Sequence, residues 1–147
     1  MRLSVTTKLP QLQNLIKRDP GGYNDEFLQQ HRHYLSELQI FRLDPSKKST
    51  SFSELVTFVS HVAPCYPAHC KDFPGQLMAL LRQHGRVLNP DVRITVAHAL
   101  LLLRNRGLLE ALPLFTLMFE LFEIQDKALK ALVYNHMTAD VRKVMIP

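Results

Sequence analysis

The sequence predicts an all-α protein, and three observations support this prediction. Apolar residues recur at three- and four-residue spacing along most of the chain, which is the period of an amphipathic helix. Leucine dominates the apolar residues, and the β-branched residues are scattered instead of alternating as in a strand. The chain of 147 residues has only five glycines, and 46% of its residues are hydrophobic. This content is enough to build the packed core of one helical domain.

The first half of the chain contains three expected helices. A short amphipathic helix covers 9–18, and the turn Asp19-Pro20-Gly21-Gly22 ends it because proline disfavours helix in the residue before it. A long helix follows at about 23–42. After a polar loop, Ser51 and Glu54 match the capping box that begins a third helix, and Pro64 kinks or ends that helix.

The second half begins with a bent, proline-rich connector at 65–74. Asn89-Pro90-Asp91 is the best helix start in the chain, because Asn caps free N–H groups, Pro fits the first turn and Asp complements the helix dipole. Gly107 is expected to end that helix, and Asp126 to cap the last one. The helix at 90–106 is apolar on most of its circumference, so neighbours should cover it on both sides. The helices expected here are 75–84, 90–106, 108–124 and 127–145.

Helix pairs joined by short turns are typical of HEAT or armadillo repeats. The last two helix starts, Pro90 and Asp126, lie 36 positions apart, near the ~40-residue period of such repeats. We expect a helical-repeat solenoid of about six helices at 23–147, preceded by a short helix and turn at 1–22. A globular six-helix bundle is the alternative. Because the last helix has no polar cap, the repeats are expected to continue in a longer natural protein.

The charge balance favours polyanions or acidic protein surfaces as partners. The net charge is +5, and the basic residues fall in loops or at helix ends. A favourable interaction with helix dipoles explains this placement without any ligand. In a stack of helix pairs, however, the turns line up, which predicts a basic ridge facing RNA phosphate. The candidate residues for RNA or partner binding are Lys17, Arg18, Arg82, Arg86, Arg104, Arg106, Arg142 and Lys143.

No catalytic, cofactor or metal site is expected. The nearest metal pattern is His61, Cys65, His69 and Cys70, whose side chains suit zinc. Pro64 and Pro67 break the helix face that these residues would need, so half-buried thiols and boundary histidines are the preferred interpretation. No nucleophile–base pair and no glycine-rich phosphate loop is present. The chain is therefore expected not to be an enzyme and to take no small-molecule substrate.

The cellular setting expected from the sequence is a reducing one without a membrane. Two cysteines do not make a disulfide framework, and the first residues lack the apolar core of a secretory signal. The longest apolar run, Ile94 to Leu103, is about half of what a membrane span needs.

Several long blocks, in order, resemble the severe-depolymerization-of-actin family of nucleolar proteins. The similarity runs from about Leu9 to Lys143, nearly the whole chain. The blocks are LPQLQNLIKRDP with the following EFLQQHRHY, then FVSHVAPCYPAHCKDFP, LNPDVRITVAHALLLLRNRGLL, FELF at 119–122 and DKALKALVYNHMTADVRK.

The resemblance implies a scaffold in ribosome biogenesis, located in the nucleus and nucleolus. It would dock on precursors of the large ribosomal subunit and support their maturation and nuclear export. Its partners would be proteins of the pre-ribosomal particle and, secondarily, the rRNA phosphate backbone. Family members are much longer, with a helical-repeat N-terminal region, so the chain resembles that region. The alternative is a general helical adaptor in transport or actin-cytoskeleton organisation, which would bind a partner helix in an apolar groove.

Overall fold

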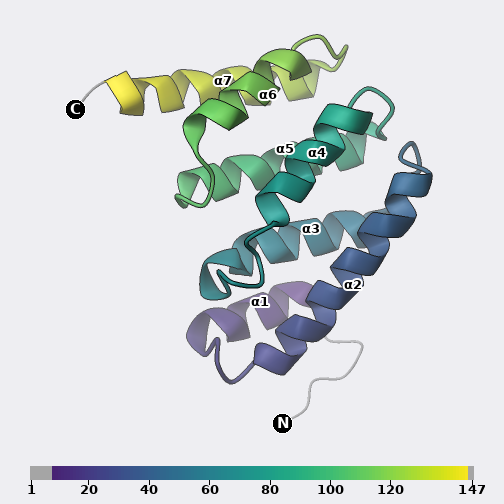
Figure 1. Cartoon of the computed structure of the whole chain (residues 1–147), viewed down its shortest axis with the longest axis vertical. Coiled ribbons are helices and arrows are strands. Elements are labelled where there is room, and N and C mark those ends of the chain that lie inside the picture. The colour runs from purple at the N-terminus through teal and green to yellow at the C-terminus, as the bar shows by residue number, and fades with distance from the viewer. Residues whose placement is uncertain (1–7, 146–147) are drawn as a thin grey trace.

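The computed structural model describes residues 8–145, and these form a stack of helices without a β-strand (Figure 1). The all-α prediction is thus confirmed. The six helices expected at 23–147 and the short helix before them are all present. The elements are α1 Leu9–Arg18, α2 Asn24–Leu43, α3 Thr50–Val62, the short 3-10 helix η1 Ala63–Cys65, α4 Phe73–His84, α5 Pro90–Asn105, α6 Ala111–Leu121 and α7 Lys127–Met145.

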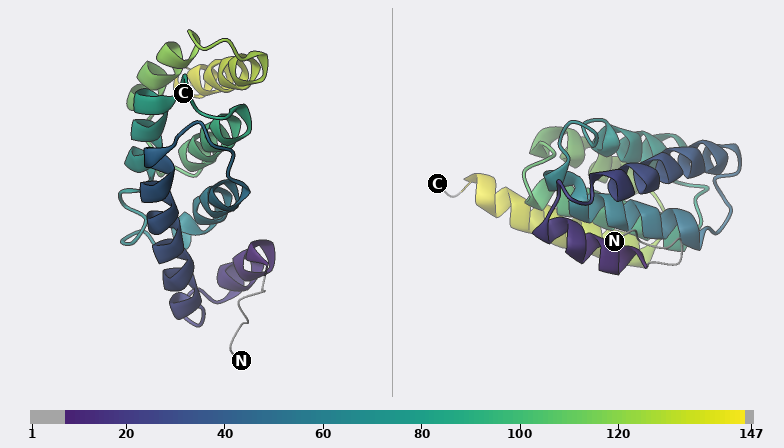
Figure 2. Two further views of the ribbon diagram at one scale, coloured as in Figure 1. Left: turned by 90° about the vertical axis from the view of Figure 1, so that its right-hand side faces the viewer. Right: turned by 90° about the horizontal axis from the view of Figure 1, so that it is seen from below.

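The helices form two layers, which Figure 2 shows side by side. In one layer α1 packs on α3, α3 on α5 and α5 on α7. The other layer contains α2, α4 and α6, and each packs against the odd-numbered helix that follows it. Each contact joins neighbours in the stack, as in a solenoid. The HEAT-like prediction is confirmed over the globular bundle, whereas the division at residue 22 stays a prediction.

The last two helix pairs repeat with a period of 37 residues. Asn89 and Asp126 cap α5 and α7 at equivalent positions. Residues that are equivalent at this spacing are buried together, as in Leu77 with Leu114, Leu80 with Leu117, and Val96 with Val133, each no more than 1% exposed. The shared burial pattern shows that α4–α5 and α6–α7 are two copies of one structural unit.

Local chemistry explains where α5 begins and ends and where α7 begins. The Asn89 side chain accepts the Asp91 N–H at 2.9 Å, and Asp126 accepts the Leu129 N–H at 3.1 Å, as expected for N-caps. Gly107 has a φ of +77°, and the N–H of the next residue, Leu108, donates to the carbonyl of Leu103 at 2.9 Å. This left-handed turn ends α5 as predicted.

Two predicted helix starts are wrong. The N-cap of α3 is Ser49, whose hydroxyl accepts the Phe52 N–H at 3.1 Å, so Ser51 is already inside the helix and forms no capping box with Glu54. The helix predicted at 108–124 is shorter, Ala111–Leu121, because the turn at Gly107 takes three more residues to reverse the chain.

Arg93 is the main polar residue inside the stack, and its side chain is only 7% exposed. Its Nε and Nη2 donate to the Asp126 carboxylate at 3.1 and 2.9 Å, and its Nη1 donates to the carbonyls of Gly85 and Leu88. Burial alone would raise the pKa of Asp126, but hydrogen bonds from Leu129 and Arg93 outweigh it and lower the pKa. One guanidinium therefore joins α5, the turn before it and the start of α7.

Replacing Arg93 with Met is expected to lower the free energy of unfolding by about 3 kcal/mol, because it leaves a buried carboxylate and two carbonyls without their donor. Urea unfolding measures the loss. Lys48→Met is the control: Lys48 lies 3.6 Å from Asp91 in an exposed pair, and its loss should cost less than about 1 kcal/mol. Equal losses in the two variants would show that the buried network contributes nothing beyond a surface pair.

Candidate interaction surface

The turns between helices lie along two opposite edges of the stack (Figure 1). The first edge carries the turns α1–α2, α3–α4 and α5–α6 and the C-terminal end of α7. The second edge carries the turns α2–α3, α4–α5 and α6–α7. The Tyr66 hydroxyl, which donates to the Pro20 carbonyl at 2.8 Å, joins two turns of the first edge. The pair of Lys48 and Asp91 joins the turn α2–α3 to the start of α5 on the second edge.

The eight basic candidates are divided between these edges and do not form one row. Arg82 and Arg86 lie at the end of α4, on the second edge. The other six lie at the ends of α1, α5 and α7, on the first edge. The two groups are separated by the length of α5, whose 16 residues span roughly 24 Å. They are Lys17, Arg18, Arg104, Arg106, Arg142 and Lys143 on the first edge, and Arg82 and Arg86 on the second.

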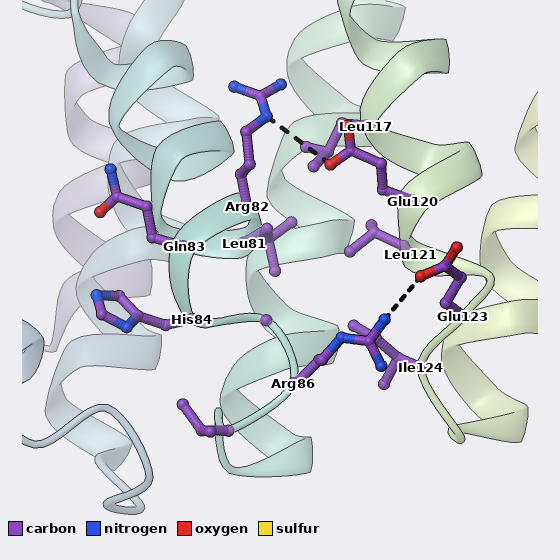
Figure 3. A pocket seen from close by; sticks show the side chains of 12 residues that line it. Leu81, Arg82, Gln83, His84, Arg86, Leu117, Glu120, Leu121, Glu123 and Ile124 are labelled. Atoms are coloured by element: carbon purple, nitrogen blue, oxygen red, sulfur yellow. Dashed lines mark hydrogen bonds and ion pairs between the residues drawn. The ribbon is translucent and has the colours of Figure 1, made fainter.

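Arg82 and Arg86 both face carboxylates of the next repeat (Figure 3). Arg86 Nη2 lies 2.7 Å from Glu123 Oε2, and Arg82 Nε lies 3.9 Å from Glu120 Oε2. The two pairs flank a pocket between α4 and α6 with an apolar floor, to which Leu121 contributes. These cations are thus partly neutralised where they stand, and a phosphate would have to compete with Glu120 and Glu123 for them.

Arg104 is paired more strongly. Its Nε and Nη2 donate to the two oxygens of the Asp140 carboxylate at 2.8 and 3.0 Å, a two-point pair between α5 and α7. The Arg104 hydrogen bond lowers the pKa of Asp140, which is only 5% exposed, so the carboxylate stays charged. His136 Nε2 lies 3.4 Å from the same carboxylate. Arg104 therefore holds two repeats together, and its charge is largely satisfied.

Five candidates remain exposed and, within residues 8–145, without an ion pair. They all lie on the first edge. His61, at the end of α3, lies close enough to feel two of these charges. Burial is the largest cause that lowers the pKa of His61, and the charges of Lys17 and Arg106 lower it further. Its buried Nδ1 has no hydrogen-bond partner among the described residues. The five are Lys17, Arg18, Arg106, Arg142 and Lys143.

The free carbonyls of the odd-numbered helices explain part of this placement. α1, α3, α5 and α7 all end at the first edge, where their dipoles favour cations. Acidic residues lie at this edge too: Asp140 is paired with Arg104, and Asp19 accepts the Gly22 N–H at 3.1 Å. The five unpaired candidates of the first edge are therefore better placed to meet a polyanion than Arg82 and Arg86, which already face carboxylates.

The histidines and cysteines of the possible zinc pattern do not meet. Across residues 8–145 no three His, Cys, Asp or Glu side chains gather in a way that could hold a metal ion. His69 packs near His31, with ring centroids 6.4 Å apart. Cys70 is buried, and burial together with the nearby Cys65 raises the pKa of its thiol to about 12. A thiol in that state is a poor metal ligand and a poor nucleophile.

None of the helices in the described part of the chain is both long and apolar enough to cross a bilayer.

Comparison with known proteins gives one consistent result. The family model described as "SDA1, HEAT repeat" matches residues 58–146. A Protein SDA1 homolog of Xenopus tropicalis is 49% identical over 140 residues, which cover 95% of this chain and 20% of the relative. The homolog of Dictyostelium discoideum is 47% identical over 91% of this chain and 18% of its own length. Protein SDA1 of Chaetomium thermophilum is 36% identical over 95% of this chain and 19% of its own length. The chain thus spans about a fifth of the length of these relatives.

Neutralising the first edge is expected to weaken binding to a short RNA hairpin and to flatten its salt dependence. The variant Lys17→Gln with Arg106→Gln should reduce the slope of log K against log salt by about one for each phosphate that is no longer neutralised. The control, Lys47→Gln with Lys127→Gln, removes the same charge from the second edge. Fluorescence anisotropy at several salt concentrations measures both. Equal effects of the two variants would show that only net charge matters.

Proposed function

The chain belongs to the SDA1 family, and from that premise we propose that it is a non-enzymatic scaffold in ribosome biogenesis. In this proposal it docks on precursors of the large ribosomal subunit and supports their maturation and nuclear export, in the nucleolus and nucleus. The role itself is what the family resemblance of the sequence implies. The structural observation that supports this role is the set of five exposed cations on the first edge, which lie at the ends of stacked helices.

A scaffold role fits the way the stack presents its surfaces. A solenoid exposes long edges and faces relative to its volume, so that it can contact several partners at once. We propose that protein surfaces of the pre-ribosomal particle are the first partners and that rRNA phosphate is the second. Five free cations are too few to supply most of the binding energy of a large interface, but they orient the stack against a polyanion.

The chemistry of the side chains supports a role without catalysis. The pocket between α4 and α6 is lined by arginine–glutamate pairs that bridge two repeats, and such pairs are poor proton donors or acceptors for a substrate. Cys70 is held protonated by burial. These features favour binding over a reaction.

A second function, a helical adaptor in transport or actin-cytoskeleton organisation, is favoured by one observation. Phe119 and Tyr134, at the last repeat, are 65% and 62% exposed. Exposed aromatic side chains next to each other favour contact with a partner protein. An adaptor of this kind would be cytoplasmic and indifferent to RNase.

Sedimentation of the tagged chain in sucrose gradients of cell lysate tests the proposed function. We expect a fraction to migrate with large-subunit precursors and to return to the light fractions after RNase treatment. Because the first edge contacts phosphate in this proposal, Lys17→Gln with Arg106→Gln should shift protein to the light fractions, and Lys47→Gln with Lys127→Gln should not.

A full-length relative run in parallel separates two kinds of failure. If the relative migrates with the precursors and this chain does not, docking depends on parts of the relative outside the matched fifth. If both stay in the light fractions, the ribosomal proposal is wrong and the adaptor function gains support.

A further inference from the structure

Each odd-numbered helix carries a basic side chain where it ends at the first edge, and in α3 that side chain is a histidine. The last turns of α1, α5 and α7 contain Lys or Arg. α3 contains neither, and His61 is the basic residue of its last turn. Helices α1 and α5 pack against α3, so the surroundings of His61 lie inside the described stack. The row of basic residues thus has one member whose charge depends on the pH.

Two exposed cations from the neighbouring helices act on His61. They are Lys17, in the last turn of α1, and Arg106, directly after α5. Both lower the pKa of His61, after burial as the largest cause, so both lie within electrostatic reach of its imidazole. His98 of α5 lines a pocket together with His61. Within residues 8–145, neither a charge of α2, which packs on α3 from the other layer, nor any carboxylate is among the causes. Three basic groups from consecutive odd-numbered helices therefore meet at one place on the first edge.

The imidazole of His61 has one nitrogen to offer to a ligand. Its Nδ1 is buried and without a partner among the described residues, so a ligand from solvent can meet only Nε2. In the tautomer with its proton on Nε2, this nitrogen donates a hydrogen bond. Lys17 and Arg106 are exposed, and their side chains are also donors only. The three side chains therefore suit an anion with several acceptor oxygens, and a phosphate group has this chemistry.

A phosphate bound among these groups reverses the electrostatic balance at His61. In the free chain, the charges of Lys17 and Arg106 oppose a third positive charge. A phosphate offsets their charge and places an opposite charge near the imidazole, and both effects favour the protonated form. The C-terminal end of α3 favours a cation at the same place. Binding of the anion and protonation of His61 therefore support each other.

We propose that Lys17, His61 and Arg106 form one phosphate-binding cluster, in which His61 takes up a proton from solvent when an RNA phosphate binds. The inference rests on the proposed function, which places rRNA phosphate at the first edge, and it adds a regulation of that contact. The chain binds RNA more tightly as the pH falls. Affinity rises about tenfold for each unit by which RNA raises the pKa of His61, over the pH range between the free and the bound values.

Fluorescence anisotropy with a short RNA hairpin, at one salt concentration and between about pH 5 and 8, tests the proton uptake. The chain has seven histidines, and all of them gain charge in acid. The decisive quantity is therefore the difference between the unmodified chain and His61→Gln. Across this range we expect the unmodified chain to gain about tenfold more affinity than His61→Gln does. Circular dichroism checks that the variant is folded.

His84→Gln is the matched control. His84 also lies in the last turn of a helix with an arginine, but at the second edge, where Arg82 and Arg86 face carboxylates. This variant should keep the pH dependence of the unmodified chain. His61→Lys carries a permanent charge and should bind the hairpin at pH 8 about as tightly as the unmodified chain does in acid. In NMR titrations, the imidazole signal that His61→Gln removes should show a higher pKa when the hairpin is bound.

The outcomes separate this inference from the proposed function. Equal pH dependence of the unmodified chain and His61→Gln, or a pKa of His61 that RNA does not raise, overturns proton uptake and leaves the phosphate contact standing. If Lys17→Gln with Arg106→Gln binds the hairpin as tightly as the unmodified chain, the phosphate contact at the first edge is wrong, and the inference fails with it.

Discussion

The structure depends above all on a match of charges, made by arginine–carboxylate pairs, at the junction where α6–α7 stacks on α4–α5. Every arginine of the match belongs to the earlier repeat, and every carboxylate belongs to the later one. Neighbouring repeats contact only each other, so this junction fixes where the last two helices lie. Two of the pairs, Arg93 with Asp126 and Arg104 with Asp140, are buried or partly buried and therefore costly to misalign, which favours one register of stacking over its alternatives. The pairs are Arg82 with Glu120, Arg86 with Glu123, Arg93 with Asp126, and Arg104 with Asp140.

This match also determines which charges are left for partners. Of the eight basic candidates, it engages Arg82, Arg86 and Arg104, so the five candidates without an ion pair among the described residues all lie on the first edge. In the last repeat, apolar side chains replace the arginines at two of the equivalent positions, Phe119 and Val141. The described stack therefore presents unpaired cations on its first edge and exposed apolar side chains on its last repeat.

The sequence predicts local features well and pairings poorly. Asn89, Gly107 and Asp126 act as predicted because caps depend on a few neighbouring residues. The capping box fails because two serines, Ser49 and Ser51, compete for one helix start, and only the geometry of the loop selects between them. The four cross-repeat pairs join residues 33 to 38 positions apart. Such pairs can be found only once the stacking of the helices is known. The division of the basic candidates between two edges was predictable from the sequence, because consecutive antiparallel helices place alternate turns on opposite sides.

A double-mutant cycle on Arg104 and Asp140 tests the central role of the junction most directly. Urea unfolding at pH 7 should give a coupling energy of about 1–3 kcal/mol between Arg104→Ala and Asp140→Ala. Because the pKa of Asp140 is lowered in the folded state, its contribution is present above the unfolded pKa, about 4, and lost as the pH falls through the folded value. The coupling should therefore disappear in acid. Additive losses at pH 7, with no coupling, would contradict the account.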